Sequence, residues 1–234
     1  MKTIGLIGGM SWESSKVYYE WINRTVNEEL GGSHSAKSIM ISVDFAEIER
    51  LTFAGDWNKI GDLMTNATSQ LERGGADLVV LCTNTIHLVS NFITDSSKVP
   101  FLHIADATGR AIKEKSIEKV GLLGTRFTME KDFYSQTLKE NHDIETIIPS
   151  ESSCQIVHDI IYDELVKGVI KRESRDACKK ILDELESLGV EGIILGCTEL
   201  PLLISFEDSS IPLFDTTKIH AREAVKYALG EVEL

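Results

Sequence analysis

The sequence contains an internal repeat, and no other feature constrains the fold as strongly. Residues 71–81 align with residues 185–195, and each copy reads as a helix end, a glycine turn, an acidic residue and an apolar strand. Two shorter pairs match at nearly the same offset: 5–8 with 121–124, and 99–102 with 211–214. Three matches that keep one order at one approximate offset predict two copies of a single structural unit.

Short apolar segments alternate with longer amphipathic ones, a pattern typical of parallel sheets covered by helices. The apolar segments are continuously hydrophobic and β-branched, as expected of strands buried on both faces. We predict strands at 3–7, 38–43, 78–81, 101–104, 119–123, 145–148, 192–195 and 213–214. Apolar residues at helical spacing predict one helix between Ser14 and Gly31, and others at 57–73, 156–166 and 177–188.

The predicted fold class is therefore α/β, with two pseudo-symmetric three-layer α/β/α domains, mostly parallel sheets and an active site in the cleft between the domains. The third matching pair lies where the chain would leave each copy. We expect one domain to contain residues 1–99 and 212–234, and the other to contain residues 100–211. The C-terminal helix would then complete the first domain.

The composition argues against several classes of partner. With 37 acidic and 24 basic side chains, the formal net charge is −13, whereas nucleic acid and anionic membranes bind clustered Lys and Arg. The four cysteines form no C-x-x-C pair, so we expect no metal site. The first residues predict a strand rather than a signal peptide, and no apolar run reaches transmembrane length. We expect a cytoplasmic protein with reduced thiols.

Small and hydroxyl-bearing residues follow four of the predicted strands. In an open parallel sheet, ligands bind beyond the carboxyl ends of the strands, where glycines let the backbone approach a ligand closely. Helix N-termini that follow such strands present free N–H groups to anions. The four strand-end segments are 8–11, 82–85, 124–128 and 196–199. We predict that they form one small-molecule site.

The repeat aligns Thr83 with Cys197. If the two copies face each other about a pseudo-twofold axis, these side chains approach one ligand from opposite sides. That geometry suits the removal of a proton from one face of a carbon atom and the return of a proton to the other. A thiol near a helix N-terminus can have its pKa lowered from about 8.5 towards neutrality. We therefore expect Cys197 to act as a thiolate base or a thiol acid.

The chain resembles the aspartate/glutamate racemases over essentially its whole length. Four segments carry the resemblance: Gly-Leu-Ile-Gly-Gly-Met-Ser-Trp at 5–12, Cys-Thr-Asn-Thr-Ile-His at 82–87, Leu-Leu-Gly-Thr-Arg-Phe-Thr-Met at 122–129, and Gly-Cys-Thr-Glu at 196–199. The resemblance implies 1,1-proton transfer without pyridoxal phosphate, metal or any other cofactor. It also implies a homodimer and two catalytic cysteines, one from each half.

The first of those cysteines is replaced in this chain. The family's Cys-Asn-Thr triplet corresponds to Thr83, Asn84 and Thr85, whereas the second cysteine is present as Cys197. Cys82 lies one residue early and should point to the other face, because strand side chains alternate. A threonine hydroxyl is a poorer base than a thiolate but can donate or relay a proton. The resemblance makes Cys197 the base for the L-enantiomer, so we expect faster turnover from L to D, with Thr83 or a water that it holds returning the proton.

The resemblance also implies which residues bind the substrate. Arg50 and Lys167 match positions that bind a side-chain carboxylate, which favours aspartate, glutamate or both. The α-carboxylate and amine would contact Asn84, Thr85, Thr125 and Thr198, and the predicted binding set also includes Met10 and Glu199. Structural roles are the alternatives for several residues: helix capping for Thr83, packing for His87, and favourable charge at a helix end for Lys167 and Glu199.

Other functions compatible with this sequence fall into two classes. Related folds with one or two cysteines racemise a broader set of amino acids, racemise hydantoins, decarboxylate, or isomerise maleate. A protein that lost one thiol could also be an amino-acid-binding sensor without turnover. Exchange of the α-proton with solvent, measured across a panel of L-amino acids, identifies a racemase by its substrates, and a protein without exchange would be a sensor.

Overall fold

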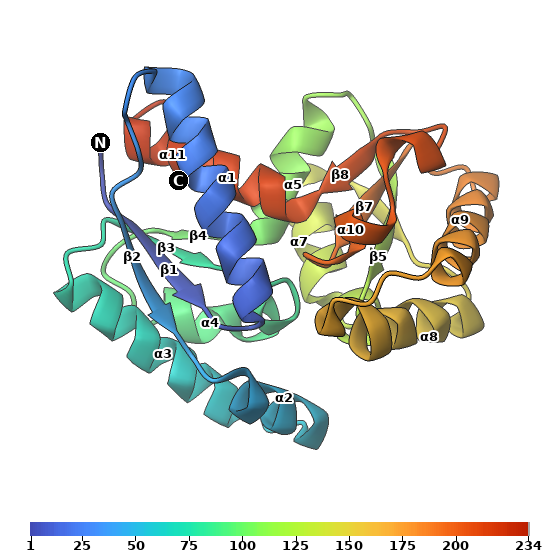
Figure 1. The fold of residues 1–234 in the computed structure, drawn as a ribbon, viewed down its shortest axis with the longest axis horizontal. Helices are drawn as coiled ribbons and strands as arrows, with labels where there is room; N and C mark the ends of the chain where they lie inside the picture. Colours follow the sequence, from blue (N-terminus) through green and yellow to red (C-terminus); the bar gives the residue numbers. More distant parts are fainter. Residues whose placement is uncertain (234) are drawn as a thin grey trace. The chain divides into compact units, whose positions relative to one another are not determined.

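The computed structural model describes residues 1–233, which form two compact units. The first contains residues 1–104 and 220–233, and the second contains Ala105–Ile219. The ribbon in Figure 1 follows the chain from blue to red, and each unit is described here by itself.

The first unit contains a four-stranded parallel sheet. Its strands are β1 (Ile4–Gly8), β2 (Ser38–Ser42), β3 (Leu78–Leu81) and β4 (Phe101–Leu102). Their order is β2-β1-β3-β4, and every neighbouring pair is parallel. All four carboxyl ends therefore lie at one edge of the sheet.

The second unit repeats this topology. Its strands are β5 (Lys119–Gly124), β6 (Glu145–Ile147), β7 (Gly192–Gly196) and β8 (Leu213–Asp215). Their order is β6-β5-β7-β8, again with parallel pairs throughout. The predicted α/β fold with duplicated parallel sheets is confirmed, and each of the eight predicted strands overlaps an observed one.

Helices connect the strands in both units. In the first part of the chain they are α1 (Trp12–Leu30), α2 (Phe45–Ala54), α3 (Trp57–Arg73), the 3₁₀ helix η1 (Thr85–Val89) and α4 (Ser90–Thr94). They continue with α5 (Ile104–Lys113), α6 (Arg126–Glu130), α7 (Asp132–His142), α8 (Glu151–Asp159), α9 (Arg172–Ser187), α10 (Leu200–Leu203), the 3₁₀ helix η4 (Phe206–Asp208) and α11 (Thr216–Leu229). None of the helices within residues 1–233 combines the length and apolar character needed to cross a bilayer.

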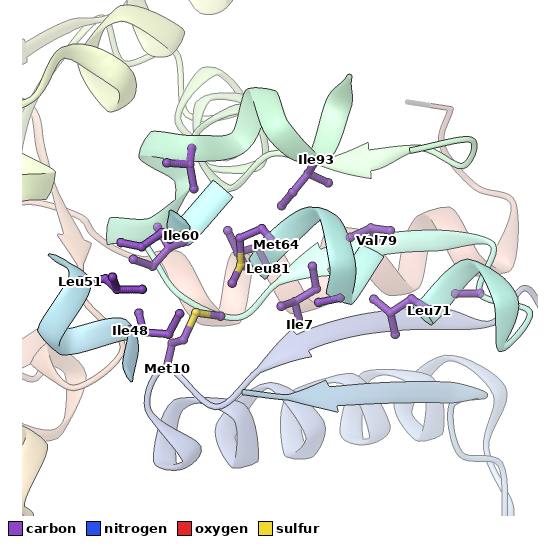
Figure 2. Packing of buried hydrophobic residues seen from close by; sticks show 14 residues of the cluster. Ile7, Met10, Ile48, Leu51, Ile60, Met64, Leu71, Val79, Leu81 and Ile93 are labelled. Atoms are coloured by element: carbon purple, nitrogen blue, oxygen red, sulfur yellow. The ribbon is translucent and has the colours of Figure 1, made fainter. Parts of the chain in front are cut away.

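The two central strands of the first sheet, β1 and β3, are buried on both faces, as their apolar sequences require. Figure 2 shows the cluster between this sheet and α3, which includes Ile7, Val79, Leu81, Met64 and Leu71. Side chains alternate along a strand, so Leu6 and Val80 point to the other face, where α1 packs against β1. Both are fully buried.

The duplication extends to the hydrogen bonds between a helix end and the loop that precedes the last strand of each sheet. In the first unit, Glu72 at the end of α3 accepts a hydrogen bond from Ser97 Oγ at 3.2 Å. In the second unit, Glu186 at the end of α9 accepts one from Ser209 Oγ at 3.0 Å. Each serine hydroxyl also contacts a backbone carbonyl two residues later. The repeat therefore preserves individual polar contacts as well as the strand order.

Three features differ from the sequence expectation. Residues 100–104 were expected in the second domain, but β4 pairs with β3, so the first unit continues as far as Ile104. Residues 212–234 were expected to return to the first domain, but β8 pairs with β7, so the chain stays in the second unit as far as Ile219. The helix expected at 156–166 is interrupted: α8 ends at Asp159 and is followed by a π-helical turn η2 (Ile160–Glu164) and a 3₁₀ turn η3 (Leu165–Lys167). Apolar spacing alone does not distinguish an α-helical turn from these two variants.

Candidate active site

The predicted strand-end residues occupy the carboxyl edges of their sheets. Most are nearly buried in the structure: Met10, Thr83, Asn84, Thr85, Thr125, Cys197 and Glu199. Met10 follows β1, Thr83 follows β3, Thr125 follows β5 and Cys197 follows β7. These are the two central strands of each sheet, and the crevice outside such strands is where open parallel sheets bind ligands.

The glycines at these strand ends are explained by packing within the protein. Gly9 has φ +94°, and a Cβ there would overlap the carbonyl oxygen of Val43. A Cβ on Gly124 would lie 2.8 Å from the carbonyl oxygen of Gly196 on the neighbouring strand. Close approach of a ligand to the backbone was the expected reason for these glycines, but close approach of another backbone segment is sufficient.

Cys82 and Thr83 differ in environment, although they are adjacent. Cys82 is fully buried, and burial raises the pKa of its thiol far above the ordinary value. Thr83 is 8% exposed to solvent. A fully buried and protonated thiol is a core side chain, so Cys82 packs as the alternation of strand side chains predicts.

His87 connects the Thr83 turn to the end of β4. Its Nε2 accepts the backbone N–H of Ile104 at 3.2 Å, so Nδ1 carries the ring proton and donates to the Thr83 carbonyl oxygen at 2.8 Å. Burial, and then the neighbouring His103 and His220, lower the pKa of His87 well below its ordinary value. A neutral His87 therefore holds the Thr83 backbone in place.

Cys197, Thr198 and Glu199 form a compact polar group after β7. The Cys197 thiol donates to Glu199 Oε2 at 3.0 Å, and Thr198 Oγ1 donates to the same oxygen at 2.6 Å. Both Cys197 and Glu199 are buried, at 8% and 7% exposure. The carboxylate is thus an acceptor shared by two neighbouring side chains.

The expectation of a lowered pKa for Cys197 is wrong. Burial of the thiol and the charge of Glu199 raise its pKa well above the ordinary value. The backbone N–H groups of Glu199 and Leu200 act in the opposite direction, but their effect is smaller. The helix that follows, α10, has only four residues. The sequence correctly predicted a helix N-terminus after Cys197. It did not predict that the Glu199 carboxylate raises the pKa of the thiol by more than this N-terminus lowers it.

Thr125 begins α6 as its N-cap, and its side chain accepts the backbone N–H of Thr128. The next residue, Arg126, donates its backbone N–H to Nδ1 of His158 on α8, at 3.2 Å. Burial lowers the pKa of His158. His158 is therefore a neutral imidazole beside a strand-end loop. His158 was not among the predicted site residues, because nothing in the local sequence pattern indicates a contact between residues so far apart in the chain.

The two predicted cations lie on helices rather than at strand ends. Arg50 is an exposed residue of α2, which follows β2. Lys167 ends the 3₁₀ turn after α8, and its ammonium lies 3.4 Å from Asp163 in an exposed pair. Such a pair contributes little to stability in water.

The described residues also form surface depressions outside the predicted site. Two open depressions, of about 510 Å³ and 450 Å³, lie around α7 and β6 and contain none of the predicted site residues. The second is lined by Glu118, Lys119 and Glu191, which lie at the amino ends of the strands. Within residues 1–233, no group of three or more His, Cys, Asp or Glu side chains is arranged to hold a metal ion.

The duplicated parallel-sheet fold, with hydroxyl and thiol side chains at its strand ends, is of the Asp/Glu racemase type. A family model described as Asp/Glu/Hydantoin racemase matches residues 7–224. The chain belongs to this family, as the sequence resemblance indicated.

Individual relatives support the assignment. A crystal structure of a proposed Asp/Glu racemase from Yersinia pestis is 52% identical, with a TM-score of 0.93 over 98% of this chain and 100% of that one. An aspartate racemase homologue from Pyrococcus horikoshii is 36% identical, with a TM-score of 0.86 over the same shares. The broad specificity amino-acid racemase RacX of Bacillus subtilis is 27% identical over 75% of each chain.

Proposed function

We propose that this protein racemises aspartate, glutamate or both by cofactor-independent 1,1-proton transfer. The observation that carries the proposal is the pair of equivalent strand ends, after β3 and after β7. The first carries the Thr83 hydroxyl. The second carries the Cys197 thiol, which is hydrogen-bonded to the Glu199 carboxylate. A hydroxyl and a thiol of this kind can hold or transfer a proton.

In this proposal, Cys197 removes the α-proton from the L-enantiomer. Thr83, or a water that it holds, returns a proton to the opposite face of the α-carbon. Asn84, Thr85, Thr125 and Thr198 bind the α-carboxylate and the amine, with Met10 beside them. Arg50 and Lys167 bind the side-chain carboxylate, and both are exposed cations in the structure.

The expected preference for the L-enantiomer has a thermodynamic limit. The two enantiomers have equal free energy in water, so kcat/KM must be the same in both directions. The asymmetry between a thiol and a hydroxyl therefore shows in kcat and KM separately. It also shows in exchange without inversion, since Cys197 can return a solvent-derived proton to the face from which it removed one.

The proposal is tested by incubating a panel of L-amino acids with the enzyme in deuterated water. We expect deuterium at the α-position of aspartate or glutamate and accumulation of the D-enantiomer. Incorporation into several neutral amino acids as well would instead favour broad specificity, which is the activity named for the Bacillus subtilis relative. Absence of exchange from every amino acid would overturn the racemase proposal.

The same panel tests the role of Arg50. In Arg50→Ala we expect the KM for aspartate to rise about tenfold or more, because one charged contact to the side-chain carboxylate is lost. Any neutral amino acid that the enzyme accepts should be affected much less. An unchanged KM for aspartate would remove Arg50 from the substrate-binding set.

A further inference from the structure

We infer that Glu199 takes up the thiol proton of Cys197 when Cys197 acts as a base, so that the two side chains work as one proton-transfer pair. This inference rests on the proposed function, and it gives Glu199 a role different from the substrate contact expected from the sequence. The turn between β7 and α10 carries both side chains.

The geometry gives the thiol one clear acceptor. Cys197 Sγ lies 3.0 Å from Glu199 Oε2, a distance at which a thiol donates to a carboxylate. Thr198 Oγ1 donates to the same oxygen at 2.6 Å, which restrains the carboxylate in that position. Because Glu199 is only 7% exposed, water screens these contacts little.

The resting state of Cys197 makes such an acceptor necessary. Burial and the charge of Glu199 hold its pKa well above the ordinary value, so at neutral pH the residue is a thiol. A thiol cannot remove a carbon-bound proton until its own proton has left. Glu199 is already hydrogen-bonded to that proton, so no rearrangement precedes the transfer.

The step balances without any further reactant. The S–H bond of Cys197 breaks and an O–H bond forms at Glu199 Oε2, leaving a thiolate. The Cα–H bond of the substrate then breaks and a new S–H bond forms, and the electron pair remains on the α-carbon. A proton from the Thr83 side completes the inversion, water reprotonates that side, and Glu199 releases its proton to water.

Two experiments on Glu199→Gln distinguish this role from substrate binding. With L-aspartate, we expect kcat to fall about 100-fold or more, as for loss of a general base, while KM stays within about threefold. Glu199→Asp, which keeps a carboxylate, should recover part of kcat. Glu173→Gln is the control, because Glu173 is an exposed acid on α9. A large rise in KM with kcat retained would overturn the inference in favour of a substrate contact.

The second experiment needs no substrate turnover. Iodoacetamide labels thiolates, and labelling of the peptide that contains Cys197 can be followed against pH by mass spectrometry. In Glu199→Gln the labelling midpoint should fall by roughly one pH unit or more, because the carboxylate charge is gone and the amide N–H groups stabilise a thiolate. The variant would thus have a more reactive thiol and a slower reaction.

An unchanged labelling midpoint in a folded Glu199→Gln variant would overturn the inference, whatever the activity. If the wild-type protein exchanges no amino-acid proton, the proposed function fails. The labelling shift would still show whether Glu199 controls the Cys197 proton. The two failures are therefore distinguishable.

Discussion

At the scale of single residues, the protonation state of the buried His87 side chain is coupled to the backbone structure around it. Its two ring nitrogens are both used by backbone groups, one as donor and one as acceptor. A second ring proton would displace the Ile104 N–H. The residue must therefore remain neutral for the Thr83 turn to keep its position.

This predicts a pH dependence of stability. The pKa of His87 is lowered from the ordinary value of 6.5 in the folded state, so below about pH 6.5 the unfolded chain binds a proton that the folded protein does not. Folding is then opposed by up to about 1.4 kcal/mol per pH unit as the pH falls. Above that pH both states are neutral, and no effect remains.

The measurement is urea unfolding at several values between pH 7.5 and pH 5.5, followed by tryptophan fluorescence. All three tryptophans lie within the first 57 residues, so the signal reports the first unit. In His87→Gln, whose amide can still donate and accept, the loss of stability towards low pH should be smaller than in the wild type. Equal slopes in the two proteins would contradict the account.

The sequence predicted these residues to different degrees. The strand-end positions of Thr83 and Cys197 follow from the repeat, because homologous loops sit at homologous strand ends. The proton state of Cys197 did not follow, since it depends on whether the Glu199 side chain turns back towards the thiol. The contact between Arg126 and His158 was also beyond prediction, because it joins segments whose packing no local pattern encodes.

At the scale of elements, the repeat is visible in how strands meet helices. Gly5 on β1 packs against Leu71 of α3, and Gly121 on β5 packs against Leu185 of α9. The two contacts are equivalent in the two units. They differ in what surrounds them, because a Cβ on Gly5 would also lie 2.8 Å from the backbone carbonyl oxygen of Leu78.

This difference predicts unequal effects of the same substitution. Gly5→Ala should lower the free energy of unfolding by about 3 kcal/mol, because a backbone atom cannot move aside. Gly121→Ala should cost about 1 kcal/mol, since its nearest neighbour is the flexible end of the Leu185 side chain. Urea unfolding followed by circular dichroism measures both, and equal or reversed losses would contradict the packing argument.

The elements themselves were largely predictable. The strands are short and rich in apolar and β-branched residues, so all eight were found from composition and spacing. The interruption of the helix after Asp159 was not, because apolar spacing there continues through the π-helical and 3₁₀ turns. The return of the chain to the first unit was predicted before β8 but occurs after it. An apolar strand at the edge of one sheet and an apolar segment that begins a connection have the same sequence pattern.

At the scale of the whole molecule, the protein contains two copies of one unit, with Thr83 at a strand end of one copy and Cys197 at the equivalent strand end of the other. The proposed function requires both side chains to act on one substrate, and the difference between a hydroxyl and a thiol makes their contributions unequal. The homodimer implied by the family resemblance stays a prediction, which light scattering in solution would test.

The central claim is that Cys197 and Thr83 act on opposite faces of one α-carbon. The most direct measurement compares deuterium exchange with inversion of L-aspartate in deuterated water, for the wild type, Cys197→Ser and Thr83→Ala. We predict that Cys197→Ser loses both processes. Thr83→Ala should lose inversion, equally from either enantiomer, while L-aspartate still exchanges its α-proton. Unchanged inversion in Thr83→Ala, or exchange that survives in Cys197→Ser, would contradict the account.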